Sequence, residues 1–217
     1  MGFADRRDAG RQLAASLAAL VGRPSVVLAL PRGGVPVAFE VARALAAPLD
    51  VLGARKLSAP ANPERAFGAI AEGGVVVLDQ HAAWRCGVTQ AGLDEAVARE
   101  REELARQIAL YRAGRPAQGA AGSVAVVVDD GLATGLTALA AVRAARARGA
   151  ASVILATPVG APQAVAMLSE EADEVICHTI PRRLRAVGVF YGDFSPVSDE
   201  EVTSHLRDAA AEFEVAH

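Results

Sequence analysis

Short apolar runs alternate with helical patterns along most of the chain. Runs rich in Val, Leu and Ile predict buried strands over about residues 25–30, 49–54, 124–128, 152–157 and 174–177. Helical spacing of apolar residues predicts helices over about 5–21, 35–45, 93–111, 135–148, 161–168 and 199–213. This alternation is typical of parallel strands joined by crossover helices, and it predicts an α/β fold.

The pattern lapses before the long central helix. Residues 55–65 include Asn62 and Pro63 and show little periodicity, so we predict an irregular loop of unusual length there. Such loops are uncommon inside compact domains and are often functional. Residues 67–71 and 75–78 predict a hairpin beside this loop.

The central helix, about 93–111, combines one apolar stripe with charged positions on the opposite side. Glu95 with Arg99 and Glu102 with Arg106 have i,i+4 spacing, which predicts ion pairs on a solvated face. We therefore expect this helix to be scaffold.

Composition narrows the class of protein. A chain of 217 residues can bury a sizeable core and requires only one domain, so we expect a single domain over residues 1–217. The net charge of −3 provides no global basic field for nucleic acid or anionic lipid, and we expect neither as a partner. Any affinity for phosphate must come from a local site.

Several common kinds of site are missing from the sequence. Cys86 and Cys177 match no zinc or disulfide spacing, the four histidines are scattered, and the usual nucleotide-hydrolase, dinucleotide and serine-hydrolase motifs are absent. The first 21 residues show no cleavage signal, and no apolar run approaches the roughly 18 residues of a membrane span. These features predict a mature cytoplasmic protein.

The strongest chemical signal lies at a strand-to-helix junction, residues 126–137. Asp129 and Asp130 directly follow the strand, at the end where ligands bind in open α/β sheets. A loop then offers backbone N–H groups and two hydroxyls at a helix N-terminus, a suitable cradle for a phosphate monoester. The predicted cradle residues are Ala133, Thr134, Gly135, Leu136 and Thr137.

The two acids require a separate explanation, because they would repel a phosphate. Ribose hydroxyls donate hydrogen bonds to carboxylates, so a sugar phosphate satisfies both halves of the junction. The simpler alternative is that Asp129 and Asp130 only cap the following helix and Thr134 closes a turn.

This junction resembles the ribose-phosphate signature of type I phosphoribosyltransferases, in which a hydrophobic run precedes two acids and a Thr-Gly-x-Thr loop. Along the whole chain, the sequence is most similar to a bacterial group described as predicted phosphoribosyltransferases. Features carrying that similarity include Arg55-Lys56-Leu57, Asn62-Pro63-Glu64 and Gly68-Ala69. The resemblance implies a mostly parallel five-stranded core sheet flanked by helices, a small hood from the N-terminal and 178–217 segments, and a mobile loop or hairpin over about 55–68.

The resemblance also implies a ligand, 5-phosphoribosyl 1-pyrophosphate (PRPP). Its 5-phosphate would occupy the 133–137 loop, and its ribose hydroxyls would meet Asp129 and Asp130. Arg32, Gly33 and Gly34 look like the pyrophosphate loop, in which the bond matching Arg32–Gly33 is often cis. Arg55 and Lys56 would meet the leaving pyrophosphate.

Further roles follow from the same resemblance. Asp129, Asp130, Lys56 and Arg32 are the expected catalytic residues. Mg²⁺ is the expected cofactor, held mainly by ligand oxygens and water, with Asp129, Asp130 or Glu64 as candidate protein ligands. Phe190-Tyr191 is a candidate base contact, although a core or interface anchor is the favoured interpretation of both Tyr191 and Trp84.

The expected function is transfer of a 5-phosphoribosyl group from PRPP to an unidentified nitrogenous base, with release of magnesium pyrophosphate. Family analogy favours a homodimer. One alternative is a non-catalytic regulator of the same fold that senses PRPP or a nucleotide. Another is an enzyme that uses the same cradle on a different ribosyl phosphate.

Overall fold

The computed structural model describes residues 2–23, 25–59 and 62–216, without the side chains of residues 62–65 and 216. Its core is a parallel sheet with the strand order β2-β1-β6-β7-β8. The strands are β1 (Ser25–Ala29), β2 (Leu49–Val51), β6 (Val124–Val128), β7 (Ser152–Val159) and β8 (Glu174–Thr179). The predicted α/β class and five-stranded sheet are confirmed.

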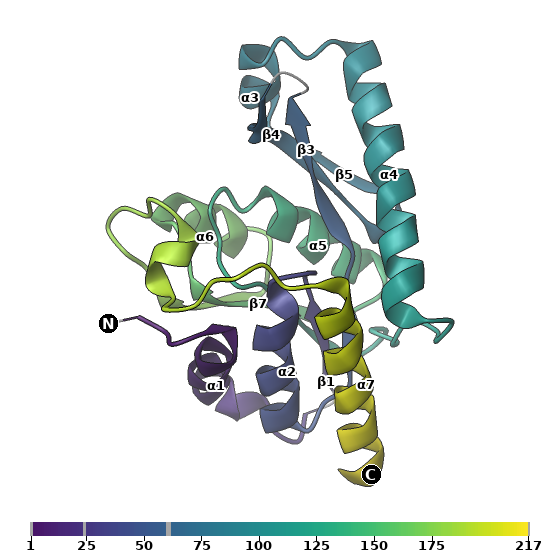
Figure 1. Cartoon of the computed structure of the whole chain (residues 1–217), viewed down its shortest axis with the longest axis vertical. Helices are drawn as coiled ribbons and strands as arrows, with labels where there is room; N and C mark the ends of the chain where they lie inside the picture. The colour runs from purple at the N-terminus through teal and green to yellow at the C-terminus, as the bar shows by residue number, and fades with distance from the viewer. Residues whose placement is uncertain (1, 24, 60–61, 217) are drawn as a thin grey trace.

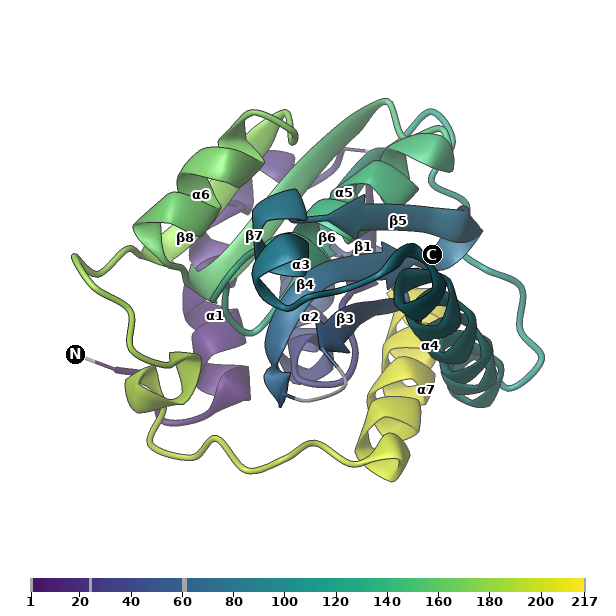
Figure 2. The ribbon, with the colours of Figure 1, turned by 90° about the horizontal axis from the view of Figure 1, so that it is seen from above.

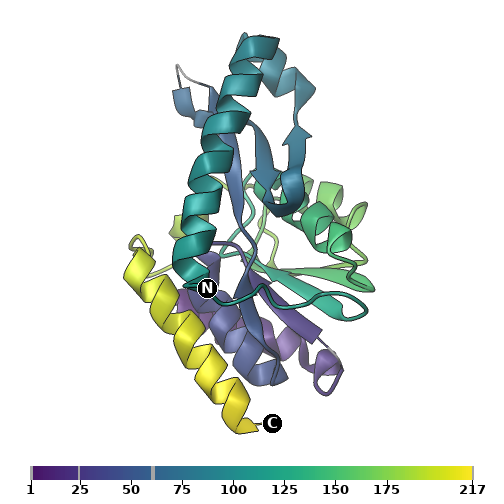
Figure 3. The same cartoon turned by 90° about the vertical axis from the view of Figure 1, so that its right-hand side faces the viewer.

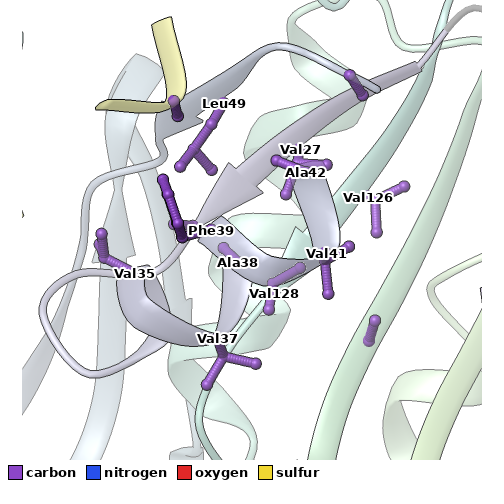
Figure 4. Packing of buried hydrophobic residues seen from close by; sticks show 14 of the residues in the cluster. Val27, Val35, Val37, Ala38, Phe39, Val41, Ala42, Leu49, Val126 and Val128 are labelled. Atoms are coloured by element: carbon purple, nitrogen blue, oxygen red, sulfur yellow. The ribbon is translucent and has the colours of Figure 1, made fainter. Parts of the chain in front are cut away.

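Helices cover both faces of this sheet (Figure 2). On one face lie α1 (Arg6–Ser16), α2 (Gly34–Leu45) and α7 (Asp199–Ala216), and on the other lie α5 (Leu136–Ala147) and α6 (Pro162–Ser169). Because β1 and β6 are buried on both faces, β6 is apolar throughout and β1 is apolar after Ser25, without alternation. Figure 4 shows Val27 and Val126 packing beside Val41 and Ala42 of α2.

A second sheet, antiparallel and in the order β3-β4-β5, stands above the core (Figure 1). It consists of β3 (Ala54–Ala59), β4 (Asn62–Ala71) and β5 (Val75–Leu78). With α3 (Gln80–Arg85) and α4 (Gln90–Arg112) it forms a lobe, and α4 runs along the whole height of this lobe in Figure 3. The predicted hairpin, β4 with β5, is confirmed.

The predicted irregular loop over 55–65 is wrong, because its described residues, 55–59 and 62–65, belong to β3 and β4. The pairing of these strands shifts register on both sides of Ser58. Such irregularities break the two-residue alternation by which a strand is recognised in a sequence. Leu57, Phe67 and Ile70 nevertheless form an apolar cluster with Ala96 and Leu104 of α4.

A partly buried ion network joins the lobe to the core. The Arg112 guanidinium at the end of α4 lies 3.1 Å from the Asp50 carboxylate of β2 and 2.8 Å from the Glu72 carboxylate between β4 and β5. Arg148, after α5, also reaches Glu72 at 2.8 Å. These contacts attach the lobe to β2 of the core sheet and to the C-terminal end of α5.

The segment between β8 and α7 forms a hood that contains a short 3-10 turn, η3 (Val187–Phe190). Phe3 pairs with Tyr191 in an isolated bridge, so the N-terminal segment belongs to the same layer. A reciprocal cap begins α7, with hydrogen bonds between Ser198 and Glu201 at 2.7 and 3.1 Å.

Two other 3-10 turns are η1 (Ala18–Leu20) and η2 (Glu72–Gly74). No helix in the described ranges is long and apolar enough to cross a membrane.

Candidate active site

A cleft of about 1500 Å³ lies between the core sheet, the lobe and the hood. The predicted site residues that line it are Arg32, Gly33, Arg55, Lys56, Asp129, Asp130, Ala133, Thr134, Gly135 and Thr137. Gly34 and Leu136 are buried in the first turns of α2 and α5 and do not line it. The fold thus brings three predicted segments, far apart in sequence, to one cleft.

The acidic pair follows β6 directly. Asp129 Oδ1 accepts a hydrogen bond from the Asp130 N–H at 2.9 Å. Burial, and next the negative charge of Asp130, raise the pKa of Asp129 well above its usual range, while Lys56 opposes the shift. An ionised Asp129 is therefore costly without a ligand, and hydroxyl donors or a cation would relieve that cost.

The loop before α5 matches the predicted cradle. No side chain caps this helix, so its first N–H groups are open at the cleft. Gly135 has φ of 80°, and a Cβ there would lie 2.9 Å from Met167 Cε and 3.1 Å from Ala164 Cβ. Glycine is thus required by both backbone conformation and space. The geometry suits a phosphate at the helix N-terminus.

The Arg32-Gly33-Gly34 loop follows β1 beside the acidic pair. The cis peptide bond lies at Pro31–Arg32, so the position implied by the resemblance, Arg32–Gly33, is wrong by one residue. A Cβ on Gly33 would collide with the Asp130 carboxylate. The Arg32 side chain is half exposed, and its guanidinium lies 3.7 Å from Asp199 at the start of α7.

Arg55 and Lys56 differ in their surroundings, although both line the cleft from β3. The Arg55 Nε donates to Glu100 at 2.7 Å, and a second nitrogen donates to Gln107 at 3.2 Å. Lys56 is exposed and has no ion-pair partner among the side chains described. Lys56 is therefore the more available cation. Glu64 lies in β4, but its side chain falls outside the described part of the structure.

The central helix α4 is a wall of the cleft as well as scaffold, because Arg99, Glu100 and Gln107 line the cleft. The predicted i,i+4 pairs are wrong: Arg99 meets Glu100 at 3.3 Å, and Arg106 meets Glu103 at 2.7 Å. Sequence spacing identified the polar side of the helix. It carried no information on whether that side meets solvent or the cleft.

Arg6 is a cleft residue to which sequence reasoning gave no role. Its Nε donates to Asp130 Oδ2 at 2.8 Å, and its NH1 donates to the Ser195 carbonyl oxygen at 2.8 Å. The two partners lie far from Arg6 along the chain, so no local motif could reveal these contacts.

The hood confirms the favoured interpretation of Tyr191 as a core anchor rather than a base contact. Phe190 and Tyr191 do not line the cleft, whereas Phe194 does. The Tyr191 hydroxyl donates to the Asp130 carbonyl oxygen at 2.5 Å, and its ring packs with Phe3. Tyr191 is thus a core residue beneath the site. Trp84, on α3, is 78% exposed and is not a core anchor.

The cleft offers few protein ligands for a metal ion. Within the described residues, no group of three or more His, Cys, Asp or Glu side chains forms a metal-binding cluster. Asp129 and Asp130 nevertheless present the carboxylate oxygens that Mg²⁺ prefers. The donor set fits a Mg²⁺ ion that takes most of its ligands from a bound phosphate compound and water.

Comparisons with known proteins agree with this arrangement. A family model described as "Phosphoribosyl transferase domain" matches residues 6–189. Two curated Mycobacterium tuberculosis proteins, named "Putative phosphoribosyl transferase MT0597" and "Putative phosphoribosyl transferase Rv0571c", are each 50% identical over 211 residues. The match covers 97% of this chain but 48% of theirs, so the chain spans about half the length of these curated relatives.

A solved structure is similar along nearly the whole chain. It is the crystal structure of TT1426 from Thermus thermophilus, which is 44% identical in sequence, with a TM-score of 0.79. The similarity covers 96% of this chain and 99% of that one. The lobe and the hood are thus parts of a fold shared with a solved protein.

Proposed function

The chain belongs to the phosphoribosyl transferase domain family, and on that premise we propose that its cleft transfers the 5-phosphoribosyl group of PRPP to a nitrogenous base. One observation carries the proposal. Asp129 and Asp130 lie between the uncapped N-terminus of α5 and the Arg32-Gly33 loop, all within one cleft. A ligand that carries a phosphate, vicinal hydroxyls and a diphosphate matches these three features. The phosphate would lie at the N-terminus of α5, the hydroxyls at the two acids, and the diphosphate at the Arg32-Gly33 loop.

The phosphate and ribose would be held by β6 and the loop that follows it. The 5-phosphate would accept hydrogen bonds from the N–H groups and hydroxyls of residues 133–137. The ribose hydroxyls would donate to Asp129 and Asp130, and these hydrogen bonds would satisfy the partly buried carboxylates. The anomeric carbon would then face the space between the lobe and the hood.

The diphosphate would lie between Arg32 and Lys56, with β3 and β4 as its cover. In the reaction the bond from the anomeric carbon to the pyrophosphate oxygen breaks, and a bond to a ring nitrogen of the base forms. The cations stabilise the negative charge that develops on the departing pyrophosphate. The carboxylates beneath the ribose favour the positive charge that develops on the sugar ring.

Mg²⁺ fits this proposal as a cofactor. It would be held by Asp129 or Asp130 together with ligand oxygens and water, and when bound it would neutralise charge on the diphosphate. Arg32 and Lys56 would supply the remaining positive potential.

The test is pyrophosphate release from PRPP in the presence of Mg²⁺ and a panel of purine, pyrimidine and pyridine bases. We expect release with at least one base, and its loss in the Asp129→Asn, Asp130→Asn double variant. Asp94→Asn, which changes an exposed acid on α4, is the control and should retain activity. Tight PRPP binding without release for any base would instead support the non-catalytic sensor.

A further inference from the structure

Arg6, the first residue of α1, lies where four segments of the chain meet. Its guanidinium binds the Asp130 carboxylate and the Ser195 carbonyl, both at 2.8 Å, and lies 3.9 Å from the centre of the Phe194 ring. The side chain is only 11% exposed, and that of Asp130 is 16% exposed. Because both side chains are largely shielded from solvent, the Arg6–Asp130 pair differs from a surface ion pair, which contributes little to stability.

Asp130 is restrained from the other directions as well. Its carbonyl oxygen accepts the Tyr191 hydroxyl, and a Cβ on Gly33 would collide with its carboxylate. The same Cβ would lie 3.3 Å from Arg6 Nε, so the guanidinium also abuts the pyrophosphate loop. Arg6 occupies Oδ2 of Asp130, and a carboxylate has further lone pairs with which to accept a ligand hydroxyl.

The positive charge of Arg6 lies beside the acidic pair, Asp129 and Asp130. Two adjacent carboxylates in a partly buried site repel one another, and a sugar that donates hydroxyl hydrogens requires them as acceptors. The guanidinium binds the Asp130 carboxylate and, because its other nitrogen is fixed by the Ser195 carbonyl oxygen, also sets the direction in which that carboxylate points.

We infer that Arg6 is a positioning residue for the ribose site: it holds the Asp130 carboxylate in the orientation that receives the ribose hydroxyls, and it ties that orientation to the hood. This inference rests on the proposed function. It assigns Arg6 no contact with the reacting atoms. The competing explanation is that Arg6 only joins α1 to the hood.

The experiment compares two ligands by calorimetry in the absence of base. Ribose 5-phosphate carries the hydroxyls, whereas tetrahydrofurfuryl phosphate keeps the ring and the phosphate but lacks them. The ratio of their affinities isolates the hydroxyl contribution from general electrostatic attraction. Variants are Arg6→Gln, which removes the charge, and Arg6→Lys, which keeps the charge but cannot reproduce the planar fork of contacts.

The matched control is Arg7→Gln on the same helix. The Arg7 Nε pairs with Glu40 at 2.7 Å, and Arg7 does not line the cleft. The Arg7→Gln variant should therefore show the same ratio of the two affinities as the unmodified protein.

We expect Arg6→Gln to lower the preference for ribose 5-phosphate at least about tenfold, the scale of one hydrogen bond to a charged group. Arg6→Lys should fall between this variant and the unmodified protein. An unchanged ratio, including an equal loss of affinity for both ligands, would overturn the inference. If Arg6→Gln does not fold, the ratio in Arg6→Lys decides the question. Failure of the unmodified protein to bind ribose 5-phosphate would overturn the proposed function itself, a distinguishable result.

Discussion

Gly34 lies against the backbone of Asp129, although the two residues are far apart in sequence. A Cβ on Gly34 would lie 3.1 Å from Asp129 Cα and 2.7 Å from the Val128 carbonyl oxygen. They meet because β1 and β6 are parallel neighbours, with Ala29 opposite Val128, so both chains leave the sheet at the same edge. The loop proposed for pyrophosphate and the acids proposed for ribose are thus packed as one unit.

Replacing Gly34 by Ala should disturb both segments together. Because the added methyl has no space, we expect a loss of about 1–3 kcal/mol in the free energy of unfolding and weaker PRPP binding. Thermal melting and calorimetry measure the two effects. Gly119→Ala is the control, since a Cβ there meets nothing within 4 Å. Equal behaviour of the two variants would contradict this packing.

Asp129→Asn should stabilise the ligand-free protein at neutral pH. Because the pKa of Asp129 is raised in the folded state, folding favours its protonated form, and stability falls as pH rises from the usual pKa of about 4 toward the raised value. The neutral amide avoids that loss, and its oxygen can still accept the Asp130 N–H. We expect a melting temperature a few degrees higher at pH 7, on the order of 1 kcal/mol, with the difference vanishing below about pH 4. A lower melting temperature at pH 7 would show that ionisation of Asp129 does not destabilise the folded protein.

Lys56→Ala should weaken PRPP binding but leave ribose 5-phosphate binding and thermal stability unchanged. Lys56 is exposed and lines the cleft from β3, so its proposed direct contact is with the diphosphate, although its charge also acts on Asp129. Calorimetry with the two ligands provides the comparison. The neighbouring Arg55→Ala is the contrast, because Arg55 is bound to Glu100 and Gln107, and its loss should lower the melting temperature. If Lys56→Ala lowered the affinities for PRPP and ribose 5-phosphate equally, the proposed contact of Lys56 with the diphosphate would be wrong.

Arg112→Met should destabilise the attachment of the lobe to the core. Its guanidinium, 12% exposed, neutralises Asp50 and Glu72, and its removal leaves the buried Asp50 without an ion-pair partner and Glu72 paired with Arg148 alone. We expect a loss of about 3 kcal/mol, measured by denaturant unfolding. Arg106→Met on the same helix is the control, because its pair with Glu103 is solvated and its loss should leave unfolding unchanged. Similar curves for the two variants would mean that the network contributes little.

Local pattern in the sequence was sufficient for the core strands and for the junction at residues 126–137. A buried parallel strand is recognised by its own apolar run, and the residues that follow it stand at the carboxyl edge of the sheet wherever the strand lies. For this reason the sequence alone assigns Asp129, Asp130 and the Thr134-Gly135 loop to one site. The family resemblance added the Arg32-Gly33 loop, which the fold places in the same cleft.

Only the tertiary structure decided how that site is enclosed. The register shifts around Ser58 hid β3 and the first half of β4 from any periodicity. The polar side of α4 faces the cleft because of where the lobe is attached. The contacts of Arg6 with Asp130 and Ser195 depend on strand order and helix packing, which set distances between segments remote in sequence. One arginine produces no repeating pattern in the sequence, so its contacts cannot be recognised from the sequence alone. The chemistry of each segment is therefore local and readable in the sequence, whereas the partners that orient it arise only when the chain is folded.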